Sequence, residues 1–155
     1  MIEAVPKHIF SRDFVLHSPD GSLVELDVSN WRDRAEFDLE GVEYRLYREG
    51  MVTGDFILER AGVVIARATK PSVFRERFEL EVSGHSVSMK KLSLWRRGFG
   101  VFDGEQLVGS IAPAGLFTRR TIVTMPDDWA LALQLFLFWL VLLMWRRNAA
   151  AANGA

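Results

Sequence analysis

The sequence predicts a mainly β protein, a closed antiparallel β-barrel of about 10–12 strands with a hydrophobic α-helix through its centre. A hairpin-like phrase repeats along the first three quarters of the chain, and one continuous apolar segment follows the last repeat. Short strands at regular spacing, joined by turn signals, are typical of a sandwich or a barrel. A barrel of this size has an interior that needs filling, and a central helix is one known way to fill it.

Each phrase begins with a phenylalanine two residues before an aliphatic side chain and contains a glycine a few residues later. Side chains alternate along a strand, so both apolar groups face the same side of the sheet. The glycine supplies the positive φ that tight hairpin turns need. Five predicted hairpins give ten strands, and Arg120–Met125 reads as one more. The phrases are Phe14–Leu16 with Gly21, Phe37–Leu39 with Gly41, Phe56–Leu58 with Gly62, Phe78–Leu80 with Gly84, and Phe99–Val101 with Gly104.

The apolar segment Trp129–Trp145 reads WALALQLFLFWLVLLMW, with one glutamine as its only polar residue. Two aspartates precede it and two arginines follow it, which complements a helix dipole. We therefore expect a helix over about residues 127–147, within a single domain of residues 1–147, and a disordered tail over 148–155. Its predicted core side chains are Trp129, Leu133, Phe136, Leu137, Leu140 and Met144.

The same segment also allows a different interpretation, a membrane tail anchor. Seventeen residues of helix span about 25 Å, at the short edge of what crosses a bilayer core of about 30 Å. Trp129 and Trp145 could form an aromatic belt. The arginine pairs on its two sides are balanced, however, so the orientation rule gives no support to a span. We favour a helix that is apolar all round because protein surrounds it.

Composition excludes several classes of function. Nineteen basic residues nearly balance twenty acidic ones, for a formal net charge of −1, which argues against a nucleic-acid-binding protein. The chain has no cysteine, which excludes disulfides, thiolate metal sites and a cysteine nucleophile. The first ten residues lack the basic start and apolar run of a signal peptide. We expect a cytoplasmic protein that associates with a membrane surface.

No catalytic constellation is visible, and we expect a protein that is not an enzyme and holds no metal or cofactor. The histidines His8, His17 and His85 lie in different parts of the repeat, without a metal-type partner at helical or strand spacing. A hydrolase using His85 or His17 remains a minor alternative.

Basic pairs are the sequence's main candidates for binding. Solvated turns and strand ends explain such pairs in most proteins. Where several pairs converge in space, they attract anionic lipid at roughly 1 kcal/mol per basic residue. The candidates for phospholipid head-group contacts are Lys90, Lys91, Arg96, Arg97, Arg119 and Arg120.

A meander of about a dozen strands followed by one very hydrophobic C-terminal helix resembles the tubby C-terminal-like superfamily. That group includes the tubby domains, the phospholipid scramblases and the LURP-one-related proteins of plants. The resemblance covers roughly Phe10 to Arg147 and includes the phrases Gly54–Leu58 and Phe78–Leu80. It implies that the helix threads the barrel, and that basic side chains on the barrel surface bind phosphoinositide head groups.

The sequence thus predicts a non-enzymatic, tubby-like barrel that binds phospholipid head groups or a membrane surface. Two alternatives stay open. One is a tail-anchored membrane protein with residues 129–145 as its transmembrane helix, and the other is a protein-interaction module.

Overall fold

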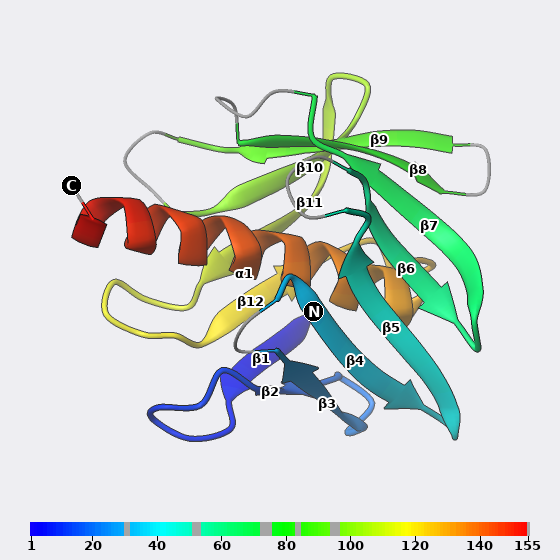
Figure 1. Ribbon diagram of the computed structural model, residues 1–155, viewed down its shortest axis with the longest axis horizontal. Helices are drawn as coiled ribbons and strands as arrows, with labels where there is room; N and C mark the ends of the chain where they lie inside the picture. The colour runs from blue at the N-terminus through cyan, green and yellow to red at the C-terminus, as the bar shows by residue number, and fades with distance from the viewer. Residues whose placement is uncertain (30–31, 51–53, 72–75, 83–84, 94–96, 155) are drawn as a thin grey trace.

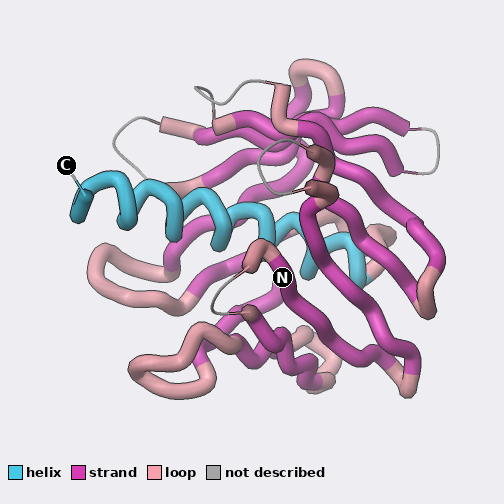
Figure 2. The backbone as a smooth tube through the Cα atoms, in the orientation of Figure 1, coloured by secondary structure: helices cyan, strands magenta, loops and turns pink. Residues whose placement is uncertain are grey.

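The computed structural model describes residues 1–154 apart from 30–31, 51–53, 72–75, 83–84 and 94–96. Twelve antiparallel strands form a closed barrel around one long helix (Figures 1 and 2). The mainly β class, the closed barrel and the central helix are as predicted. The strands are β1 (Ile2–Pro6), β2 (Phe14–His17), β3 (Leu23–Val28), β4 (Arg34–Leu39), β5 (Val42–Arg48), β6 (Phe56–Arg60), β7 (Val63–Thr69), β8 (Arg77–Val82), β9 (His85–Lys91), β10 (Phe99–Asp103), β11 (Gln106–Pro113) and β12 (Thr121–Thr124).

The repeated phrases are hairpins. Each leading phenylalanine lies on the first strand of an antiparallel pair, namely β2–β3, β4–β5, β6–β7, β8–β9 and β10–β11. All five rings are buried in the core. The turn between β4 and β5 has positive φ at both central residues, 52° at Glu40 and 80° at Gly41, as a two-residue type I′ turn requires.

A strand that the repeat does not contain closes the barrel. β1 pairs with β12 on one side, where Ala4 lies opposite Thr121, and with β2 on the other, where Ala4 lies opposite Leu16. Ile2 and Ala4 are buried and alternate with the more exposed Glu3. This alternation extends over too few residues to predict a strand from the sequence, and Pro6 weakens the strand signal further.

The helix α1 runs from Leu131 to Gly154. It begins later than predicted, because residues 127–129 form a turn in which the Trp129 amide donates to the Pro126 carbonyl. It also ends later: residues 148–154 are helical, whereas the sequence predicted a disordered tail. Alanine has the highest helix propensity, so the run of alanines after Asn148 continues the helix beyond the barrel.

The helix fills the barrel with side chains on all its faces. Every residue from Leu135 to Val141 has no solvent exposure. Aromatic rings join helix to strands edge to face, with centroids 5.1 Å apart for Phe14 and Phe138 and 5.9 Å apart for Phe56 and Trp139. Of the predicted core side chains, five are buried, namely Leu133, Phe136, Leu137, Leu140 and Met144, whereas Trp129 precedes the helix and is partly buried against the core.

The two ends of the barrel differ in their connections. At the hairpin end, which we define as the end with turns 18–22, 40–41, 61–62 and 104–105, residues 125–130 lead into the helix. At the opposite end, the helix-exit end, lie the connections 7–13, 29–33, 49–55, 70–76, 92–98 and 114–120, of which 30–31, 51–53, 72–75 and 94–96 are not described. The helix emerges at this end (Figure 1).

Charge is separated between these ends. The charged residues in the described turns of the hairpin end are all acidic: Asp20, Glu40, Glu105, Asp127 and Asp128. Basic residues predominate in the described connections and helix of the other end: Lys7, Arg12, Arg32, Lys70, Arg97, Arg119, Arg120, Arg146 and Arg147. The acids there are Asp13, Asp33, Glu49, Asp55 and Glu76. The net charge is therefore close to zero although the two ends of the barrel carry charges of opposite sign.

Tyr47 gives the fold a measurable alkaline transition. Its hydroxyl donates to the Glu59 carboxylate on the neighbouring strand, and this bond, with burial as the second cause, raises the pKa of Tyr47 to about 12. In the unfolded chain a tyrosine pKa is about 10. The bond therefore stabilises the fold fully below about pH 10, and this contribution is lost as pH rises toward about 12.

Absorbance titration of the Tyr44→Phe variant, in which Tyr47 is the only tyrosine, measures this pKa directly. We expect a midpoint near 12 in the folded protein and near 10 in urea. A folded-state midpoint near 10 would contradict the assignment.

Candidate functional site

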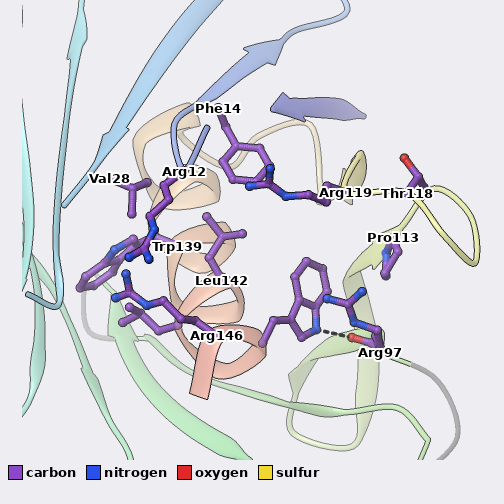
Figure 3. Close-up of a pocket in the computed structure, with 12 residues that line it drawn as sticks. Arg12, Phe14, Val28, Arg97, Pro113, Thr118, Arg119, Trp139, Leu142 and Arg146 are labelled. Carbon is purple, nitrogen blue, oxygen red and sulfur yellow. Dashed lines mark hydrogen bonds between the residues drawn. The ribbon is translucent and has the colours of Figure 1, made fainter. Parts of the chain in front are cut away.

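A pocket of about 290 Å³ opens at the helix-exit end, beside the last buried turns of α1. Four arginines line it, each from a different part of the chain: Arg12 from the β1–β2 connection, Arg97 from β9–β10, Arg119 from β11–β12, and Arg146 from the helix. Figure 3 shows Arg12 and Arg146 on one side of the Leu142 side chain, with Arg97 and Arg119 on the other. Topology alone brings these residues together.

The floor of the pocket is apolar and aromatic. It consists of Phe14 on β2 with Trp139, Leu142, Leu143 and Trp145 on the helix. Trp139 is fully buried, and within the described part of the chain its indole N–H has no hydrogen-bond acceptor. A buried donor without an acceptor costs about 1–3 kcal/mol. The pocket therefore combines an apolar wall with a cationic rim.

Arg119 and Arg97 are held in place without being neutralised. The Arg119 guanidinium donates to the carbonyls of Ile9 and Ser11, at 3.2 and 2.5 Å, and lies 5.6 Å from the centre of the Phe14 ring. The Arg97 guanidinium lies 4.7 Å from the centre of the Trp145 ring, whose N–H donates to the Arg97 carbonyl. Among the described residues, no carboxylate forms an ion pair with either guanidinium. Their positive charges are therefore available to a bound anion.

The neighbouring arginines share one carboxylate. Asp33 lies 3.4 Å from a nitrogen of Arg146, 2.9 Å from one of Arg147 and 3.7 Å from one of Arg48. One negative charge cannot neutralise three guanidinium groups. Arg146 also donates to the Ser29 carbonyl at 3.2 Å, which fixes it at the pocket rim. The ion pairs position these arginines and leave a net positive charge.

Two further titratable groups at this end have shifted pKa values. Burial lowers the pKa of Lys70, and the positive charges of Arg147 and Arg48 lower it further. Burial alone would raise the pKa of Glu76, but hydrogen bonds from Asn148 and Lys91, with the attraction of Lys91 and Lys70, hold that pKa below its usual value. The lowered pKa of Glu76 reflects its hydrogen bonds and its attraction to neighbouring cations, whereas that of Lys70 reflects burial first and the arginines second.

The structure unites only some of the basic residues singled out in the sequence. Arg97 and Arg119 line the pocket. Lys90 lies on β9 with its ammonium 4.5 Å from the centre of the Phe102 ring, and Lys91 pairs with Glu76 at 3.0 Å. Arg120, which directly precedes β12, pairs with Glu3 on β1. Arg96 lies outside the described residues. Sequence reasoning missed Arg12, which stands alone in a short connection and has no neighbouring basic residue to mark it.

His85 and His17 lie away from the pocket, whereas His8 is exposed in the β1–β2 connection at the helix-exit end. His85 is at the hairpin end, with its Nε2 2.9 Å from an Asp103 oxygen, and both side chains are exposed. It borders a second pocket, of about 400 Å³, together with Trp129 and Leu133. His17 is exposed at the end of β2, in a distant part of the barrel wall. No group of three or more His, Asp or Glu residues in the described ranges is arranged to hold a metal ion.

By length and composition α1 could cross a membrane, and half of its most apolar stretch is buried within the protein. No protein-family model, curated protein or solved structure matches this chain.

Proposed function

We propose that this barrel binds the head group of an anionic phospholipid at a membrane surface, in the arginine-lined pocket of the helix-exit end. The observation that carries the proposal is the meeting of Arg97 and Arg119, neither paired with a described carboxylate, above an apolar floor. A phospholipid has the matching chemistry, because its charged phosphate adjoins an apolar glyceride body.

Arginine suits the phosphate. Its planar guanidinium donates two parallel hydrogen bonds to phosphate oxygens, and it is less strongly hydrated than an ammonium group. The stacking of Arg97 on Trp145 and of Arg119 on Phe14 fixes both groups before a ligand arrives, which reduces the entropy lost on binding.

The alternatives fit less well. A tail anchor would require the helix to leave the barrel, which would expose five buried phenylalanines and the rings of Phe136 and Phe138 to water or lipid. A nucleic acid would need a longer basic track than one pocket. The proposal agrees with the resemblance to the tubby C-terminal-like superfamily, to which we assign the chain as part of the same proposal.

Vesicle binding tests the proposal with the full chain. We expect binding to phosphatidylcholine vesicles that contain phosphatidylserine, and much weaker binding to phosphatidylcholine alone. The Arg97→Glu/Arg119→Glu variant should bind the anionic vesicles at least tenfold more weakly, because each basic residue contributes about 1 kcal/mol near such a surface. Raising the salt concentration should weaken the binding of the wild-type protein to anionic vesicles, since surface charges are then screened.

A matched control carries the same change in charge on the outer barrel wall. Arg45→Glu/Lys90→Glu alters two exposed side chains that do not line the pocket, and we expect it to keep most of the wild-type affinity. Equal losses of vesicle affinity in both variants would show that binding depends only on the overall charge of the protein. Absence of binding at low salt would overturn the proposal.

A further inference from the structure

Two connections beside the arginine pocket each contain a pair of exposed apolar residues. Ile9 and Phe10 are 80% and 90% exposed, and Leu116 and Phe117 are 90% and 102% exposed. Large apolar side chains are most often buried in soluble domains, and exposed ones that gather at one place mark an interaction site. These four residues lie at the end of the molecule where the pocket opens.

The two connections are neighbours in space. β1 and β12 pair with each other, so the connection that follows β1 and the one that precedes β12 leave the barrel at the same edge. Arg119 links them, since its guanidinium donates to the Ile9 and Ser11 carbonyls. Figure 1 shows the blue and yellow loops projecting from the end at which the helix emerges.

We infer that Ile9, Phe10, Leu116 and Phe117 insert into the hydrocarbon of a bilayer while the arginine pocket holds its head groups. This inference rests on the proposed function and adds the means and orientation of docking. The barrel then stands on the membrane by its helix-exit end, with the acidic hairpin end turned away.

The arrangement favours a bilayer as the occupant. The apolar pairs lie on separate projecting connections with a cationic pocket beside them. A partner that fits must present anionic groups at its surface and apolar material just below them. A membrane of anionic phospholipid has this layering throughout. Burial of an exposed phenylalanine in hydrocarbon strengthens binding by about tenfold or more.

The absence of cysteine from the chain allows a direct test with single labels. Phe10→Cys and Phe117→Cys, each labelled with an environment-sensitive fluorophore, report insertion at the two tips. Leu107→Cys is the control, because Leu107 is 52% exposed at the start of β11, at the hairpin end. We expect a blue shift and quenching by lipid-borne quenchers at positions 10 and 117 with phosphatidylserine vesicles, and neither change at position 107.

Affinity separates this inference from the proposed function. Phe10→Ser/Phe117→Ser should weaken binding to the same vesicles at least tenfold and leave its salt dependence unchanged, whereas Arg97→Glu/Arg119→Glu should reduce that dependence. If the wild-type protein binds anionic vesicles through the arginines but the labels at 10 and 117 show no shift, insertion is wrong and the proposed function stands. If no vesicle binds, both fail.

Discussion

Leu137→Asp is expected to abolish folding. Leu137 lies in the middle of the helix with no solvent exposure, and its neighbours in the chain, Phe136 and Phe138, are equally buried. A carboxylate there would have no partner, and a carboxylic acid would still lack hydrogen bonds. Either form costs several kcal/mol, a large part of the roughly 5–15 kcal/mol by which a domain of this size is stable.

Soluble yield and thermal melting followed by circular dichroism measure the effect. Ala150→Asp is the matched control, because Ala150 lies on the same helix beyond the barrel and is exposed. The control should fold and melt like the wild type. A Leu137→Asp protein that stays soluble and melts cooperatively near the wild-type temperature would show that the helix does not fill the barrel.

Phe56→Ala should cost about 3–5 kcal/mol of unfolding free energy, as other deletions of a buried ring do. Phe56 is fully buried where the core meets the helix-exit end, with its ring centre 5.4 Å from that of Phe78 and 5.9 Å from that of Trp139. The guanidinium groups of Arg48 and Arg147 lie 5.3 and 5.8 Å from the same ring centre. Its loss leaves a cavity and removes the surface on which two arginines rest.

Urea unfolding gives the free energy directly. Phe117→Ala makes the identical chemical change at a side chain that is fully exposed, and it should stay within about 0.5 kcal/mol of the wild type. Phe56→Leu should recover much of the lost stability, because it refills most of the cavity. A Phe56→Ala protein as stable as Phe117→Ala would mean that the ring is not packed as described.

The strands and helix were predictable where one pattern recurs or persists. The Phe-x-aliphatic phrase occurs five times with a glycine at the turn, and the Trp129–Trp145 segment is apolar for several turns of helix. β1 was not predicted, because five residues ending in proline carry little periodicity. Its pairing with β12 depends on closure of the whole sheet, which is a tertiary property. The helical run after Asn148 was missed because alanine-rich ends are compatible with helix or disorder.

The candidate site was predictable only in part. Arg97 and Arg119 were predicted because each is adjacent to another arginine in the sequence. Such adjacency does not indicate which basic residues lie close together in the folded protein. Lys90 and Arg120 share the same sequence pattern, yet Lys90 lies on the outer wall and Arg120 lies just before β12, and neither lines the pocket. Lys90 contacts the Phe102 ring, and Arg120 pairs with Glu3. Arg12 became visible only once the order of strands placed the β1–β2 connection beside the end of the helix.

The helix that fills the barrel follows all twelve strands in the chain. During synthesis the strands therefore leave the ribosome before the segment that completes their core. Closure also joins β1 to β12, which are separated by more than 100 residues of sequence, and contacts of such long range slow folding. Until the helix is synthesised, the inward phenylalanines lack the side chains that cover them and are open to association with other chains. Chaperones have a natural point of action at this stage, after the strands have been synthesised and before the helix covers their apolar faces.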